Sequence, residues 1–183
     1  SEPWSSWESE LIMEFVAGTS LTDQLLSDGD TLVTEWKVKA EYTWDTGTAV
    51  GTFLEGLKAG RILGIKCTNC NRVLIPPRAF CELCFRPINE WVQLSDTGLI
   101  NTFSVSFVNW DATRRERPEI PAVIEIEGAS PGMGILHLLG QVGNDLDSVL
   151  KKVSIGKRVR AVWKPARERT GSITDIRYFV LVE

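Results

Sequence analysis

The stretch that decides the fold is Cys67-Thr68-Asn69-Cys70 … Cys81-Glu82-Leu83-Cys84, which contains all four cysteines of the chain. Two thiolates three residues apart on a tight turn can face one ion, and two such turns facing each other complete a tetrahedral shell of four sulfurs. Between the pairs, Val73-Leu74-Ile75 predicts a short strand and Pro76-Pro77 predicts an extended turn. The spacing therefore predicts a zinc ribbon whose ligands are Cys67, Cys70, Cys81 and Cys84.

Other interpretations of the four cysteines are weaker on chemical grounds. Two disulfides would need an oxidising compartment, whereas the first residues, Ser1-Glu2-Pro3-Trp4, have no apolar signal core and favour a cytoplasmic protein. A redox dithiol needs one Cys-x-x-Cys pair beside a βαβ pattern, not two facing pairs. Iron also fits four sulfurs, so a rubredoxin-like electron carrier stays open as an alternative. Because four cysteines fill the coordination shell, we expect a structural metal without a Lewis-acid role.

The composition is that of a globular protein with a sizeable core. The chain has 183 residues, of which 43% are hydrophobic and 24% are charged, and no apolar run approaches the ~18 residues of a membrane helix. The net charge of −4 does not favour nucleic-acid binding, and it is uneven, because the first third is acidic and the rest mildly basic. Four of the seven tryptophans lie in the acidic part, where they predict either a partner-docking surface or core packing: Trp4, Trp7, Trp36 and Trp44.

The rest of the chain has the periodicity of one helix and several short strands. An apolar stripe of Val50, Phe53, Leu54 and Leu57 predicts a helix over 48–58, which Gly60 ends. Alternating segments predict strands, and residues 113–121 read as a charged loop. The strand segments are 91–94, 99–108, 122–127, 135–142, 158–163 and 174–182, with an acidic-capped helical turn at 145–150.

The order of these segments is typical of a small closed barrel of the OB kind, in which a helix precedes the last two strands. We therefore expect a mainly β protein with N-terminal helices, in which a four-cysteine zinc ribbon is followed by an OB-fold-like β-barrel. The expected parts are an N-terminal extension over 1–47 that is a candidate for partner docking, a helix plus ribbon over 48–90, and a barrel over 91–183.

The alternation also predicts which side chains face the core. Within 99–108, Leu99, Phe103, Val105 and Phe107 are expected to share one face. The apolar run 135–142 is expected to be covered on both faces, and 174–182 is expected to alternate through Ile176, Tyr178 and Val180. The carboxylates of Glu125 and Glu127 are expected to be solvated.

Over residues 48–182 the sequence resembles the DUF35 family of zinc-ribbon/OB-fold proteins. The Pro-Pro-Arg between the cysteine pairs and the Glu-Trp-Val after them make the resemblance fairly specific. The motifs that carry it are Gly60-Arg-Ile-Leu-Gly-Ile-Lys-Cys67, Cys67-Thr-Asn-Cys70-Asn-Arg72, Ile75-Pro-Pro-Arg78, Phe80-Cys-Glu-Leu-Cys84, Glu90-Trp-Val92 with the Gly98 turn, and Ile155-Gly-Lys-Arg-Val159.

The resemblance implies an accessory subunit of an enzyme that acts on acyl-coenzyme A (CoA) thioesters, with a thiolase-fold catalytic subunit as its partner in a hetero-oligomer. It further implies a small subunit of the benzoylsuccinyl-CoA thiolase type, in aromatic compound degradation. The residues before 48 depart from the shorter members of the family, which leaves the partner and the substrate open. The resemblance also suggests that substrate passes near the junction of ribbon and barrel, where Arg78 lies.

Basic side chains are the candidates for binding the phosphates of CoA, because Arg and Lys hold phosphates through charge-assisted hydrogen bonds. Trp110 could stack on the adenine or an acyl ring, or simply pack. The basic candidates are Arg78, the loop residues Arg114, Arg115 and Arg117, and Lys157, Arg158 and Arg160 near a late turn. For each of them, a solvated surface charge is the competing interpretation.

The chain has few of the residues that acyl transfer needs. All four cysteines are assigned to the metal, and His137, the single histidine, lies in an apolar strand where it is expected to be hydrogen-bonded in the barrel wall. We therefore expect no catalytic residue and no activity of the isolated chain. A module that binds single-stranded nucleic acid is the alternative, since OB barrels do so and Phe103, Val105 and Phe107 alternate like a stacking strand.

Overall fold

The computed structural model describes residues 22–29 and 39–182, and the chain divides into two compact units, residues 1–43 and 44–183. In the first unit, helix α1 (Asp23–Ser27) begins after Thr22, whose side-chain oxygen accepts a hydrogen bond from the Leu25 N–H. No helix in the described part of the chain has the length and apolar character needed to span a bilayer. The expectations for Trp4, Trp7 and Trp36 fall outside the described residues.

The second unit begins with helix α2 (Gly47–Lys58), which matches the predicted helix. Phe53 and Leu57 are buried, whereas Val50 lies in the exposed first turn, so the predicted stripe was wrong at its first member. After the C-cap Ala59, Gly60 has a φ of +74°, the left-handed conformation in which helices commonly end, because glycine has no Cβ to oppose it. The chain then enters the ribbon.

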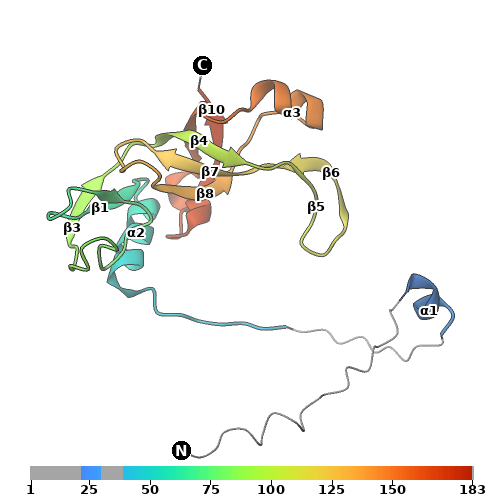
Figure 1. The fold of residues 1–183 in the computed structure, drawn as a ribbon, viewed down its shortest axis with the longest axis horizontal. Coiled ribbons are helices and arrows are strands. Elements are labelled where there is room, and N and C mark those ends of the chain that lie inside the picture. Colours follow the sequence, from blue (N-terminus) through green and yellow to red (C-terminus); the bar gives the residue numbers. More distant parts are fainter. Residues whose placement is uncertain (1–21, 30–38, 183) are drawn as a thin grey trace, which may run out of the picture. The chain divides into compact units, whose positions relative to one another are not determined.

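The ribbon is a three-stranded antiparallel sheet in which β1 (Leu63–Lys66) lies between β2 (Val73–Leu74) and β3 (Glu90–Gln93), as Figure 1 shows. Its own core is small and consists of Ile65, Leu74 and Ile88 around two of the cysteines. Strand β3 pairs with β1 through four residues, so it completes the sheet of the ribbon. The expected boundaries between the three parts of the chain stay predictions.

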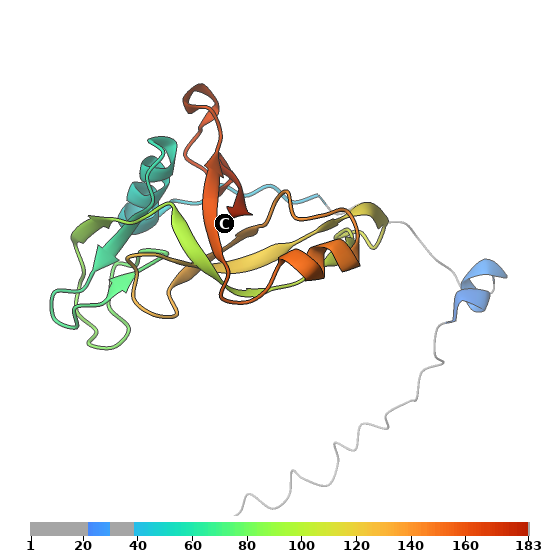
Figure 2. The ribbon, with the colours of Figure 1, turned by 90° about the horizontal axis from the view of Figure 1, so that it is seen from above.

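A five-stranded antiparallel sheet follows, in the order β10-β9-β4-β7-β8. Its edges close on each other, because Leu139 and Phe179 form a parallel bridge and the Gly140 N–H donates to the Phe179 carbonyl over 2.8 Å. This confirms the OB-like barrel, which Figure 2 shows beside the ribbon. The strands are β4 (Thr97–Phe103), β7 (Pro121–Ile126), β8 (Gly134–Leu138), β9 (Arg158–Trp163) and β10 (Ile176–Leu181).

Helix α3 (Leu146–Lys152) connects β8 to β9, where the sequence predicts the helical turn. Asp145 is its N-cap and forms a capping box with Ser148, in which the Asp145 carboxylate accepts from the Ser148 N–H over 2.9 Å. Val149 on this helix is fully buried in the barrel core. The helix therefore lies at the position that an OB barrel requires.

Residues 113–121 are not a loop, and this expectation was wrong. Strand β6 (Arg114–Glu119) pairs with β5 (Ser106–Val108) to form a hairpin inserted between β4 and β7, which extends from the barrel on the side away from the ribbon (Figure 1). Its charged composition hid the strand, because a two-stranded hairpin outside a core needs no apolar alternation. The predicted strand over 99–108 is accordingly divided between β4 and β5.

Irregular registers change which side chains face the core. In β4, Ile100 pairs with Ile124 but Thr102 pairs with Val123, so Asn101 is an extra residue without a partner in β7. As a result, Ile100 is buried and Leu99 is exposed, contrary to expectation. In β10, a similar shift after Ile176 buries Phe179. A bulge adds one residue and inverts the alternation beyond it, and an alternating pattern alone cannot locate it.

Two further expectations about exposure were wrong. The side chain of Leu136 on β8 is 67% exposed, so this strand is not covered on both faces. Glu127 is not simply solvated: its carboxylate accepts hydrogen bonds from the Thr97 hydroxyl over 2.6 Å and from Arg158 over 2.7 Å. These bonds hold the pKa of Glu127 below its usual range. Neither contact can be inferred from spacing along one strand.

A buried carboxylate organises the turn between β9 and β10, which contains two short 3₁₀ helices, η1 (Ala166–Glu168) and η2 (Ile173–Asp175). Asp175 is fully buried and accepts hydrogen bonds from the backbone N–H groups of Thr170, Gly171 and Ser172 over 2.7–3.2 Å. Burial raises the pKa of Asp175, but these bonds outweigh it and the net shift is downward.

We predict that Asp175→Asn lowers the free energy of unfolding at pH 7 by about 2 kcal/mol, because an amide cannot accept all three N–H bonds. Since the folded pKa lies below the unfolded one, the contribution of the charge is present above the unfolded value and is lost as pH falls through the folded value. Denaturant titrations between pH 7 and pH 3 should show that the difference in the free energy of unfolding between the wild-type chain and Asp175→Asn becomes smaller as the pH falls. Glu168→Gln, on the exposed surface, is the control, and a difference that does not change with pH would contradict this role.

Candidate metal centre

The four cysteines lie on two turns, here called the first knuckle (residues 67–72) and the second knuckle (residues 81–86). Each knuckle closes with the same backbone bond, because the Cys67 N–H donates to the Arg72 carbonyl over 2.8 Å and the Cys81 N–H donates to the Arg86 carbonyl over 3.0 Å. The two knuckles therefore share the pattern Cys-x-x-Cys-x-Arg and one local geometry. In each, both cysteines face the same point.

The positions of the four sulfurs fit a tetrahedral metal. All four lie within 4.8 Å of one another, and the cluster is unique among the described residues as a group of potential ligands. The separations are 3.7 Å between the sulfurs of Cys67 and Cys84 and 3.9 Å between those of Cys70 and Cys81. A zinc ion with bonds of about 2.3 Å to four sulfurs gives a tetrahedron edge of about 3.8 Å. The cluster thus fits a structural zinc ion with a closed shell.

The close approach of the four sulfurs also shifts the ionisation of their thiols. Contact with the Cys84 sulfur raises the pKa of the Cys70 thiol to about 12. In contrast, the N–H groups of Cys84 and Leu83 lower the pKa of the Cys81 thiol to about 7. Four thiolates this close repel one another, so all four are stable together only around a positive ion.

A salt-bridge cluster connects the two knuckles across the metal centre. Glu82 on the second knuckle forms ion pairs with Arg72 on the first knuckle and, over 3.5 Å, with Arg78 between them. The pair raises the pKa of Arg72, and the backbone N–H of Glu82 together with Arg72 lowers the pKa of the Glu82 carboxyl. Arg78, expected to meet substrate, is therefore engaged within the ribbon.

Each knuckle contains a residue with positive φ directly after its second cysteine. Asn71 has a φ of 54° and Phe85 has a φ of 55°. Asparagine tolerates this left-handed conformation, whereas for other residues with a Cβ it costs roughly 1–2 kcal/mol. Phe85 bears this cost while its side chain is 82% exposed, so burial does not compensate for it.

Some of the predicted phosphate-binding residues form ion pairs with other side chains of the chain, and others form none within the described residues. Arg115 on the hairpin donates to the Asn109 side chain over 2.8 Å and pairs with Glu119 over 3.4 Å. Arg114, Arg117 and Lys157 form no ion pair within the described residues, and Trp110 is 99% exposed near the hairpin tip. The remaining arginines also pair with acidic neighbours, at 2.7 Å for Arg158–Glu127, 3.9 Å for Arg160–Asp96 and 3.5 Å for Arg78–Glu82.

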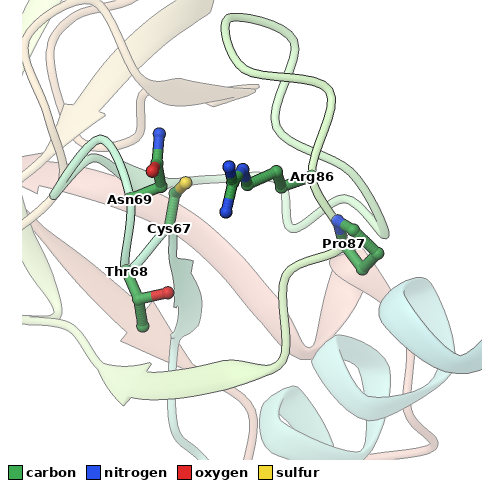
Figure 3. A pocket seen from close by; sticks show the side chains of 5 residues that line it. All are labelled: Cys67, Thr68, Asn69, Arg86 and Pro87. Atoms are coloured by element: carbon green, nitrogen blue, oxygen red, sulfur yellow. The ribbon is translucent and has the colours of Figure 1, made fainter.

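One basic residue that the sequence reasoning missed is Arg86, which ends the second knuckle. It lines a pocket of about 510 Å³ with Thr68, Asn69 and Pro87, and Figure 3 shows its side chain directed toward Asn69 and Cys67 across that pocket. The repeated Cys-x-x-Cys-x-Arg pattern was a visible signal for it. Arg72 and Arg86 stand at equivalent positions, but only Arg72 has an acidic partner among the described residues.

His137 lies in the barrel wall, as expected. Its Nε2 lies 3.2 Å from the Ile173 carbonyl, its Nδ1 accepts from the Leu138 N–H over 2.8 Å, and its ring packs edge-on against Phe179. These contacts are consistent with a neutral ring in which Nε2 carries the proton and donates it to the carbonyl. The histidine thus has a structural role in the wall.

We predict that Cys84→Ser abolishes stoichiometric zinc binding and unfolds the ribbon, because metal binding supplies the folding energy of so small a core. Metal analysis by mass spectrometry and the fluorescence of Trp91 on β3 should report both losses. Thr68→Ser in the first knuckle is the matched control. A Cys84→Ser variant with full zinc content would show that the metal is held elsewhere.

Known proteins resemble this chain in its sequence and its fold. Residues 54–90 match the family model of the ChsH2 rubredoxin-like zinc ribbon domain. A DUF35 domain-containing scaffold protein of Methanocaldococcus jannaschii is 31% identical over 108 residues, which cover 58% of this chain and 70% of that protein.

Two solved structures are also similar. A DUF35 protein of unknown function from Sulfolobus solfataricus has the same fold, with a TM-score of 0.53 and 22% identity over 74% of this chain and 84% of that one. The Ltp2-ChsH2(DUF35) aldolase has a TM-score of 0.48 and 20% identity over 78% of this chain and 97% of that one. The zinc-ribbon match and the extensive identity to the archaeal protein together mean that this chain belongs to the DUF35 family.

Proposed function

We propose that this chain is the zinc-containing, non-catalytic subunit of a heteromeric acyl-CoA C-acyltransferase of the thiolase type, which supports assembly and acyl-CoA binding. The observation that carries the proposal is the identity to an archaeal relative named a scaffold protein, over 70% of that relative's length. A catalytic partner of thiolase fold follows from the resemblance to the DUF35 family described above. Aromatic acyl-CoA degradation is the proposed context.

The chemistry of the described residues supports a binding role. All four thiols converge on one metal centre, and the imidazole of His137 is used within the barrel wall, which leaves no Cys or His nucleophile or base of the kind that thiolases require. In contrast, large aromatic side chains are exposed, among them Phe85 and Trp110. Aromatic side chains are enriched at protein interfaces relative to the rest of the protein surface.

The nucleic-acid alternative receives less support. Its stacking strand was expected to present Phe103, Val105 and Phe107, but Phe103 and Val105 pack against the barrel core. The neighbouring outer surface is lined by Pro121, Leu136, His137, Leu138, Ile173 and Thr174 and contains no Lys or Arg. A single-strand groove needs both cations and exposed aromatic rings.

We predict that the tagged chain, purified gently from its native extract, carries a thiolase-fold protein in near-equal amount, identified by mass spectrometry. The complex should catalyse acyl transfer from CoA thioesters, whereas the isolated chain should not. Ribosomal or transcription proteins in its place, together with salt-dependent binding of a labelled oligonucleotide, would favour the nucleic-acid module and contradict the proposal.

Within that complex, we propose that the hairpin of β5 and β6 contributes the phosphate contacts. Arg114 and Arg117 are exposed and unpaired within the described residues, and Trp110 offers a ring for stacking near the hairpin tip. Arg115, which pairs within the hairpin, maintains its shape. Lys157, Arg158, Arg160 and Arg78 remain secondary candidates for contact with CoA.

We predict that Arg114→Ala combined with Arg117→Ala raises the KM of the complex for its acyl-CoA by roughly tenfold or more and changes kcat little, because charge-assisted contacts to a remote phosphate bind ground state and transition state alike. Steady-state kinetics with the thioester measure both constants. Arg167→Ala, on an exposed turn, is the control. An unchanged KM would mean that the hairpin arginines are surface charges.

A further inference from the structure

The two zinc knuckles share a sequence pattern and a closing backbone bond, so each serves as a reference for the other, although the second also has a bond of 2.8 Å from the Phe85 N–H to the Cys81 carbonyl. Both follow Cys-x-x-Cys-x-Arg, both close with a bond from the first cysteine N–H to the arginine carbonyl, and both place the residue before the arginine at a φ near 55°. Zinc binding and backbone closure therefore make the same demands on both. Differences between them at equivalent positions arise from something other than holding the metal.

The first difference is at the left-handed position, where the first knuckle has Asn71 and the second has Phe85. Asparagine suits this conformation, and phenylalanine is strained in it. Phe85 is 82% exposed, so its ring gains little from packing within the chain. For the isolated chain, both the strained backbone of Phe85 and the exposure of its ring to solvent are unfavourable.

The second difference is at the arginine. Arg72 on the first knuckle is paired with Glu82, which is also paired with Arg78. Arg86 on the second knuckle has no ion pair or side-chain hydrogen bond among the described residues, and its guanidinium lies at the open pocket beside Thr68 and Asn69 (Figure 3). Its capacity for bidentate pairing with a carboxylate is thus unused within the described chain.

Further apolar side chains are exposed on the same short loop. Phe80 is 59% exposed and Leu83 is 64% exposed, and the bridge between Phe80 and Pro87 brings the ends of the loop together. We call Phe80, Leu83, Phe85 and Arg86 the second-knuckle tip. Aromatic side chains and arginine are the residues most enriched at the energetic centres of protein interfaces.

We propose that the second-knuckle tip is a docking surface for a protein partner that presents an apolar pocket to Phe85 and a carboxylate beside it to Arg86. The unpaired positive charge of Arg86 argues for an acidic complement, and the ring and its apolar neighbours argue for a pocket. The identity of this partner as the thiolase-fold subunit rests on the proposed function. In this arrangement the zinc ion supports binding indirectly, because it holds the loop that carries the Phe85 ring.

The test uses Phe85→Asn, which copies the residue of the first knuckle into the second. The full-length variant and the wild-type chain are titrated against the purified partner subunit by calorimetry. The dissociation constant should rise about 30-fold or more, as when an aromatic anchor is truncated. Zinc content should be unchanged and the melting temperature equal or higher, because the strain at this position is relieved.

Matched variants separate the tip from the rest of the ribbon. Arg86→Gln should weaken partner binding about tenfold, whereas Arg72→Gln, at the equivalent position of the first knuckle, should leave binding unchanged. Leu136→Asn, which replaces an exposed apolar residue on the barrel, should also bind like the wild-type chain.

The outcomes distinguish this inference from the proposed function. If the wild-type chain binds a thiolase-fold subunit and Phe85→Asn binds it equally well, the docking surface is overturned and the function stands. If the wild-type chain binds no such subunit, the function fails, and the inference falls with that partner. Self-association of the wild-type chain that Phe85→Asn abolishes, seen by analytical ultracentrifugation, would make the occupant a second copy and would overturn the acidic partner proposed here.

Discussion

The convergence of four cysteine sulfurs on one point is the constraint on which the ribbon depends. The buried cluster of the ribbon consists of Ile65, Leu74 and Ile88 with two of the cysteines, too little apolar surface to stabilise an independent fold. The sulfur separations of 3.7 and 3.9 Å match those of a tetrahedral zinc site. Metal binding thus replaces a hydrophobic core, and the conformation of both knuckles follows from it.

The ribbon is also joined to the barrel. Val73 on β2 and Ser130 in the turn after β7 exchange hydrogen bonds of 2.9 Å through their backbone groups and the serine hydroxyl. Phe53 and Leu57 of α2 belong to the same buried cluster as Phe179 and Val149 of the barrel. The backbone of the ribbon is therefore joined to a well-packed core, so the loop that presents the knuckle side chains needs little ordering when a partner binds.

The second knuckle illustrates how function can oppose stability. Three features of this knuckle reduce the stability or solubility of an isolated chain. They are the left-handed backbone conformation of Phe85, its exposed ring, and the guanidinium of Arg86, which is unpaired within the described residues. The first knuckle avoids all three with asparagine and a paired arginine. In a complex, the same features contribute binding energy, because the ring becomes buried and the guanidinium becomes paired.

The sequence by itself determined what depends on short-range geometry. Cysteine spacing identified the ligands, the 3.6-residue period with Gly60 identified α2, and the order of strands around α3 identified the barrel. Tertiary structure decided the rest: which of Leu99 and Ile100 is buried, that the charged segment of β6 is a strand, and that within residues 22–29 and 39–182 Arg72 has an acidic partner and Arg86 has none. The physical reason is that spacing constrains neighbours along one chain, whereas bulges, exposure and ion pairing depend on residues that only folding brings into contact.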